Sequence, residues 1–126
     1  RRVILGTYTL SAGYYDAYYG RAQKARGLIK KDFEKVFEEV DVLLSPTVAA
    51  PAFKLGEKSL DPLAMYLSDI FTVPANLAGV PALSLPFGRT SGGENGKKLP
   101  ISVQLTAPWF YEGTLFETGK LLERNI

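Results

Sequence analysis

An α/β fold is predicted for this chain, because helix-like and strand-like segments alternate along it. Apolar residues recur every three or four positions from Gly13 to Glu39, and a second helical pattern covers 111–124. Short apolar runs at 42–44, 82–86 and 101–105 are typical of strands. Because helices that alternate with strands pack as layers against a sheet, we expect a mixed α/β sandwich layer.

Composition excludes several kinds of chemistry from the chain. Its 126 residues are 46% hydrophobic and 22% charged, with a net charge of +2, so charge indicates no nucleic-acid or membrane surface. The absence of Cys and His excludes disulfides, Cys/His metal sites, thiol nucleophiles and imidazole bases. No apolar run is long enough to cross a bilayer and no signal-peptide pattern opens the chain, so we expect a cytoplasmic protein without a membrane partner.

The first forty residues are expected to contain one long amphipathic helix. No element is assigned to residues 1–10, and because Arg1 is not a methionine we expect the chain to be a fragment of a longer protein. The helix runs from Gly13 to Glu39, with Ser11 as a plausible N-cap. Four tyrosines gather at its start, and we interpret them as core packing, with contact to a partner subunit or an RNA base as the alternative. They are Tyr14, Tyr15, Tyr18 and Tyr19.

A short buried strand and a long loop follow. The strand at 42–44 should stop at Ser45-Pro46. Prolines and glycine make regular structure unlikely from 47 to 62. Asp61 as N-cap and Pro62 at the first position then predict a helix within 63–72. A second short helix from 74 to 78 should end at Gly79.

The last third of the chain predicts a strand, a loop, a strand and a helix. The Gly-rich segment 88–98 separates the strands at 82–86 and 101–105. It is not a phosphate-binding loop, because Lys97 is followed by Lys98 instead of Ser or Thr. In the final helix, Glu112 lies early and Arg124 late, which suits the helix dipole.

Two observations bear on chemistry. Asp69 lies in the otherwise apolar run 64–73, where a carboxylate is costly unless it is paired, hydrogen-bonded or faces a cleft. This leaves a polar ligand site and a structural partner both open. No Ser is followed by a Lys three residues later, so nothing in the chain is expected to act alone as an activated serine.

Five stretches of the sequence together carry a specific resemblance. They are Arg2-Val3-Ile4-Leu5-Gly6-Thr7-Tyr8 with 10–19, Asp61-Pro62-Leu63-Ala64-Met65-Tyr66, Ser68-Asp69-Ile70, Val73 to Pro81, and Leu99-Pro100-Ile101 leading to Gln104. These stretches resemble the amidase-signature family, and within it the branch that works in glutamyl-tRNA(Gln) transamidation. The resemblance covers nearly the whole chain, with departures near Ser102, Ala107 and Trp109.

The resemblance implies that residues 1–126 are the C-terminal segment of a single amidase domain, an α/β/α sandwich with a mixed central sheet. The family's catalytic Ser, cis-Ser and Lys would belong to an upstream segment that this chain lacks. The implied activity is hydrolysis of glutamine, which supplies ammonia for converting Glu-tRNA(Gln) to Gln-tRNA(Gln). Implied partners are subunits B and C of the complex, and tRNA indirectly through a partner subunit. No cofactor is expected on this segment, since ATP and Mg²⁺ would be used by the partner.

In the family's glutamine pocket, an arginine binds the α-carboxylate and an aspartate binds the α-ammonium. The resemblance matches these two residues to Arg2 and Asp69 of this chain. A guanidinium offers a two-point fork to a carboxylate, and a carboxylate is the acceptor that an ammonium needs. Two other functions are weighed against this one. A stand-alone amidase acting on a small amide would have less reason to hold both charges, and a non-catalytic module would use the tyrosine-rich helix to bind a partner.

Overall fold

The computed structural model of the protein describes residues 2–11, 14–58, 61–92 and 96–124. Within these residues, three strands form one sheet in the order β1-β3-β2, and both pairings are antiparallel. The strands are β1 (Leu43–Pro46), β2 (Ala82–Arg89) and β3 (Pro100–Thr106). The helical elements are α1 (Arg2–Thr9), the π-helical turn η1 (Tyr15–Gly20), α2 (Arg21–Val36), α3 (Pro62–Leu67), α4 (Thr72–Ala78) and α5 (Glu112–Glu123).

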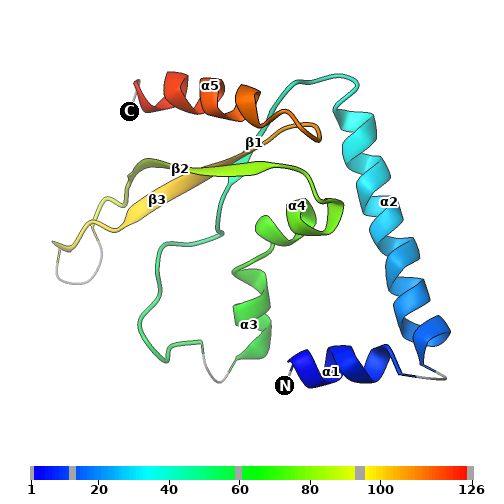
Figure 1. The fold of residues 1–126 in the computed structure, drawn as a ribbon. Coiled ribbons are helices and arrows are strands. Elements are labelled where there is room, and N and C mark those ends of the chain that lie inside the picture. Colours follow the sequence, from blue (N-terminus) through cyan, green and yellow to red (C-terminus); the bar gives the residue numbers. More distant parts are fainter. Residues whose placement is uncertain (1, 12–13, 59–60, 93–95, 125–126) are drawn as a thin grey trace.

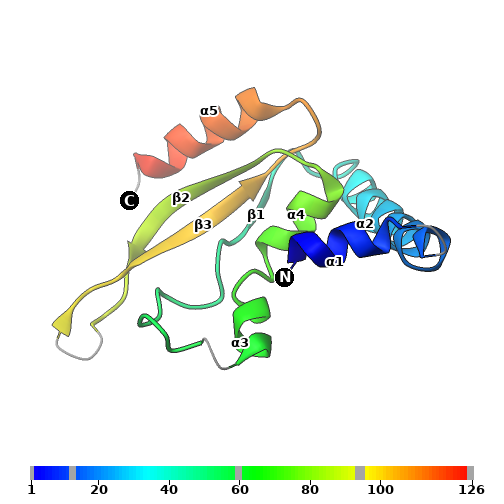
Figure 2. The same cartoon turned by 60° about the horizontal axis from the view of Figure 1, so that its bottom comes forward.

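Helices lie on both sides of the sheet, which confirms the predicted α/β class. Helix α5 covers one face, and α3 and α4 lie on the opposite side in both views (Figures 1 and 2). Helix α2 packs beside α4, and α1 lies at the far end of α2 from the sheet (Figure 1). The resemblance implies a mixed sheet, with both parallel and antiparallel strand pairs. The three described strands pair only in the antiparallel direction, so they do not test this expectation.

The N-terminal region differs from the prediction in three ways. Helix α1 forms where no element was assigned, and its last turn is closed by the Ser11 hydroxyl, which donates to the Tyr8 carbonyl at 2.6 Å. Ser11 therefore ends α1 instead of capping the next helix. The long helix itself is confirmed, but it opens with the π-helical turn η1 and ends at Val36 instead of Glu39.

The tyrosines at the start of this helix are not core residues of the chain. Tyr14, Tyr15 and Tyr18 are 38%, 49% and 56% exposed, so the core-packing interpretation is wrong here. Their rings contact one another along the helix surface: Tyr14 and Tyr18 are stacked with centroids 6.0 Å apart, and Tyr15 and Tyr19 are tilted with centroids 4.9 Å apart. A hydrogen bond with Tyr14 raises the pKa of the Tyr8 phenol.

Strand β1 is longer at its C-terminal end than predicted. Ser45 and Pro46 do not stop the strand, and Pro46 pairs in register with Val103. Among the described strands β1 lies at an edge of the sheet, where a residue without a backbone N–H is tolerated because no further strand needs that donor.

The start of α3 and the end of α4 lie where the sequence predicts them, whereas α4 begins at Thr72 instead of Pro74. The Asp61 carboxylate accepts a hydrogen bond from the Ala64 amide at 3.0 Å, with Pro62 in the first helical turn. Such a cap contributes about 1 kcal/mol. Helix α3 ends at Leu67, five residues before the predicted limit of 72, and α4 ends at Gly79 in the left-handed conformation with φ 75°.

The last third of the chain is a β-hairpin followed by α5, as predicted. Both strands are longer than predicted, and the hairpin loop is closed where the Thr90 amide donates to the Leu99 carbonyl at 2.9 Å. Gly119 lets α5 sit close to the sheet, since a Cβ at this position would lie 3.0 Å from Leu83 Cδ2 and 3.3 Å from Leu85 Cδ1.

The described residues form two hydrophobic clusters, one between the sheet and α5 and the other between α2 and α4. The first joins α5 to the strands through Leu85, Leu105, Ala107 and Leu115. The second joins α4 to α2 and contains Ala75, Ala78 and Val80, against which Ile29, Phe33, Phe37 and Trp109 pack. Ala107 and Trp109, two of the departures from the family pattern, are therefore accommodated in the clusters.

The chain exposes far more surface than a compact monomer of its size. Its accessible area is 9820 Å², whereas a compact monomer of this length exposes about 6,600 Å². Large apolar side chains contribute to the excess on α1, α2 and α3, including Ile4 at 75%, Leu28 at 65% and Leu63 at 67% exposure. Strands β1 and β2 also each have one edge that no described strand pairs.

We therefore expect the isolated 126-residue chain to self-associate, because unpaired strand edges and apolar surface favour aggregation. Analytical ultracentrifugation should show oligomers, and chemical denaturation should lack a single sharp transition. A monomer that unfolds in one cooperative step would contradict this expectation.

Candidate functional site

Asp69 lies in the turn that joins α3 to α4, and its backbone is held firmly. Its amide donates to the Tyr66 carbonyl at 3.1 Å. Its carbonyl accepts from the amides of Thr72 and Val73, at 3.1 and 3.0 Å, and from the Thr72 hydroxyl at 3.2 Å. The position of the Asp69 Cα is therefore set by the end of one helix and the start of the next.

The carboxylate of Asp69 is exposed, and no described residue forms a hydrogen bond or ion pair with it. The apolar neighbours Met65, Leu67 and Ile70 are also 45–49% exposed. The expected cost of placing a carboxylate in an apolar run is thus absent in this chain, because the run is not buried. What the structure adds is a side chain that is available to a ligand.

Arg2 is the first residue of α1, and its side chain lies outside the described part of the structure, as does Arg1. Helix α1 contacts η1, and Tyr8 of α1 lies beside Tyr14, the residue just before η1, with ring centroids 4.4 Å apart. No contact between Arg2 and Asp69 is described, so their joint role stays a prediction.

A Ser–Lys contact that the sequence analysis missed lies next to Asp69. The Lys58 ammonium donates to the Ser68 hydroxyl oxygen at 2.7 Å, and both residues are partly buried. The same ammonium lies 4.4 Å from the centre of the Phe53 ring. The two side chains share a pocket of about 370 Å³ with apolar residues of the 48–53 loop and α3. The two residues are ten positions apart in the sequence, so no local Ser-x-x-Lys pattern marks them.

The direction of the hydrogen bonds shows that this pair is not poised as a nucleophile and base. Ser68 already donates its proton to the Ala64 carbonyl at 3.0 Å, and Lys58 is the donor in the other contact. A lysine that activates a serine must accept the hydroxyl proton instead. The contact therefore fastens the loop to the C-terminal end of α3.

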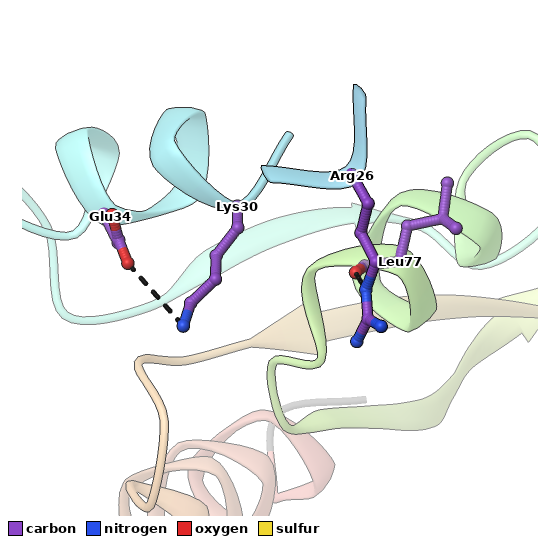
Figure 3. Close-up of polar contacts among 4 residues, drawn as sticks. All are labelled: Arg26, Lys30, Glu34 and Leu77. Atoms are coloured by element: carbon purple, nitrogen blue, oxygen red, sulfur yellow. Dashed lines mark hydrogen bonds and ion pairs between the residues drawn. The ribbon is translucent and has the colours of Figure 1, made fainter. Parts of the chain in front are cut away.

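A second, more polar pocket lies between α2 and α4. It has a volume of about 370 Å³ and is lined by Arg26, Lys30 and Trp109, among others. Figure 3 shows why it is a weaker candidate. The Arg26 Nε donates to the Leu77 carbonyl at 2.7 Å and so caps α4, and Lys30 forms an ion pair with Glu34 at 3.8 Å. The Lys30 ammonium also lies 4.9 Å from the centre of the Trp109 ring. Both cations therefore already have partners within the chain and need no ligand to explain their positions.

The described ranges contain no group of three or more His, Cys, Asp or Glu side chains arranged to hold a metal ion. Within the same ranges, no helix has the length and hydropathy needed to cross a lipid bilayer.

Comparison with known proteins defines the class of protein. The chain belongs to the amidase family, because the model of that family, described as Amidase, matches residues 1–116. A crystal structure of an amidase superposes with a TM-score of 0.75 at 26% identity and covers 100% of this chain and 28% of that one.

Two relatives with higher sequence identity carry a more specific name. The A subunit of glutamyl-tRNA(Gln) amidotransferase from Paenarthrobacter aurescens is 59% identical over 98% of this chain and 23% of its own length. The crystal structure of the corresponding A subunit from Thermotoga maritima superposes with a TM-score of 0.72 at 47% identity, covering 92% of this chain and 24% of that one. The chain thus spans about a quarter of the length of the relatives it matches.

Proposed function

We propose that this chain is part of the glutamine-hydrolysing subunit of a glutamyl-tRNA(Gln) amidotransferase. The observation that carries the proposal is 59% identity, over nearly the whole chain, to the A subunit of an enzyme of that name. A stand-alone amidase acting on a small amide is less well supported, since the amidase structure is 26% identical whereas the amidotransferase structure is 47% identical.

Residues 1–126 would form the C-terminal segment of a single amidase domain, with the remainder of the domain packed on their exposed surface. Two features support this arrangement. The chain spans about a quarter of its relatives, and it leaves strand edges and large apolar side chains uncovered. A longer domain would bury that surface.

In the complete protein the family's Ser, cis-Ser and Lys would carry out the chemistry from the part of the domain outside this chain. The Ser oxygen attacks the side-chain amide carbon of glutamine, the C–N bond breaks, and the nitrogen leaves as ammonia after taking up a proton. Water then cleaves the acyl-enzyme, which regenerates the Ser and releases glutamate.

This chain would contribute recognition of the substrate. The Arg2 guanidinium would hold the α-carboxylate of glutamine through two hydrogen bonds, and the Asp69 carboxylate would hold the α-ammonium. The exposed carboxylate of Asp69, on a backbone fixed by neighbouring helices, supports its part of this assignment. Together the two charges select a free amino acid over a simple amide.

The other participants would come from the complex. Subunits B and C are the proposed partners, and tRNA would be bound indirectly, through a partner subunit. That partner would use ATP and Mg²⁺ to activate the glutamate carried on the tRNA, and this chain would bind no cofactor of its own.

We expect the complete protein to release ammonia from glutamine and the isolated 126-residue chain to release none, because the proposed nucleophile and base lie outside it. A glutamate dehydrogenase assay measures the ammonia, with a glutamine-only blank as control. Turnover by the isolated chain above the blank would refute the assignment of the catalytic residues. Failure of the complete protein, in complex with its partners, to hydrolyse glutamine would refute the proposed function.

A further inference from the structure

The ammonium of Lys58, in the loop before α3, contacts a hydroxyl group and an aromatic ring. Lys58 is partly buried, and no carboxylate among the described residues lies within ion-pair distance of its ammonium. Its contacts are the Ser68 hydroxyl at 2.7 Å and the face of the Phe53 ring at 4.4 Å. A hydrogen bond from a charged donor is stronger than a neutral one, so this contact restrains both side chains.

The contact acts on the C-terminal end of α3. Ser68 donates its hydroxyl to Ala64 and its amide to Met65, at 3.0 and 3.3 Å, and so belongs to the last turn of the helix. A cation beside a helix C-terminus also offsets the partial negative charge of the terminal carbonyls. Lys58 therefore ties this end of α3 to the loop ten residues upstream.

Asp69 directly follows Ser68, so the direction of its carboxylate depends on how the end of α3 is held. Its own backbone bonds reach only to α3 and to the start of α4. Two described side chains donate to this turn from outside the two helices. Gln104 of β3 donates to the Phe71 carbonyl at 3.0 Å, two residues after Asp69, and Lys58 donates to Ser68, which directly precedes Asp69.

We propose that Lys58, acting through Ser68, is a positioning residue for the Asp69 carboxylate and so determines the preference for a substrate that carries an α-ammonium. The inference rests on the proposed function, in which Asp69 binds that group. Lys58 itself touches no substrate atom in this account.

The test compares two substrates in the complete protein with its partner subunits. Glutamine carries the α-ammonium, whereas 4-carbamoylbutanoate has the same chain, amide and carboxylate without it. Lys58→Met should raise KM for glutamine and lower its kcat/KM by roughly three- to tenfold. This loss is smaller than the roughly hundredfold that a small misplacement of a binding group can cost, because Lys58 acts on Asp69 only indirectly. Because the analogue makes no use of Asp69, its kcat/KM should not change.

Three further variants make the result specific. Ser68→Ala removes the acceptor and should reproduce the loss of preference, and Lys58→Arg should restore part of it. Lys31→Met, a matched change at an exposed lysine of α2, should leave the preference as in the wild type. Ser68→Ala also keeps the test decisive if Lys58→Met fails to fold.

An equal loss of activity on both substrates, or no change with glutamine, would overturn the inference. The Asp69→Asn variant distinguishes a failure of the inference about Lys58 from a failure of the proposed function. If Asp69→Asn abolishes the preference for glutamine and the Lys58 and Ser68 variants do not, only the role of Lys58 is wrong. If Asp69→Asn leaves the preference intact, the proposed pocket and the inference built on it both fail.

Discussion

Replacing Asp69 by Asn in the complete protein is expected to lower kcat/KM for glutamine by about ten- to a hundredfold. The substitution keeps the shape of the side chain and removes the charge that would hold the α-ammonium. Losing one charge-assisted hydrogen bond costs about 1.5–3 kcal/mol. The backbone bonds that fix residue 69 use only its amide and carbonyl, so the turn between α3 and α4 should remain intact. Ammonia release from glutamine measures the effect.

Arg2→Lys should act in the same direction, since a point charge cannot reproduce the two-point fork of a guanidinium. The thermal midpoint of each variant serves as the control for folding. Wild-type kcat/KM in both variants would show that neither side chain contacts glutamine.

The second large effect concerns stability. Leu105→Ala is expected to lower the free energy of unfolding by about 2–5 kcal/mol, because it leaves a cavity in the middle strand of the sheet. Leu105 is 1% exposed, and it pairs with Leu44 of β1 on one side and Leu83 of β2 on the other. Urea unfolding of the complete protein gives the measurement.

Leu105→Met is the matched control, since a swap that conserves volume costs less than about 1.5 kcal/mol. If Leu105→Ala and Leu105→Met destabilise the protein equally and slightly, the packing between β3 and α5 is not the main core of this region.

Elements that depend on local chemistry could be predicted from the sequence. Asp61 and Pro62 set the start of α3 through a cap that involves only neighbouring residues. Gly79 ends α4 because glycine adopts φ 75° without steric cost. The hairpin between β2 and β3 likewise follows from two apolar runs that flank a Gly-rich segment.

Features that depend on tertiary position could not be predicted. Whether Pro46 stops a strand or occupies its edge is decided by which strands lie beside it. Whether the tyrosines of η1 are buried depends on surfaces that pack against them, and helical spacing alone does not distinguish the two cases.

The candidate site also has a part that the sequence indicates and a part that only the structure shows. Asp69 and Arg2 came from resemblance to a family, and composition or spacing would not have selected them over other charged residues. The Lys58–Ser68 contact joins residues on two different segments, so it appears only once the loop and α3 are placed in space.

The most direct test of the central claim compares two nitrogen donors in tRNA-dependent amidation. Ammonium chloride enters the reaction downstream of the glutamine pocket and needs neither Arg2 nor Asp69. We expect Asp69→Asn to reduce amidation driven by glutamine about ten- to a hundredfold and to leave amidation driven by ammonium nearly unchanged. An equal loss with both donors would contradict the account, because Asp69 would then serve folding or assembly of the complex instead of binding glutamine.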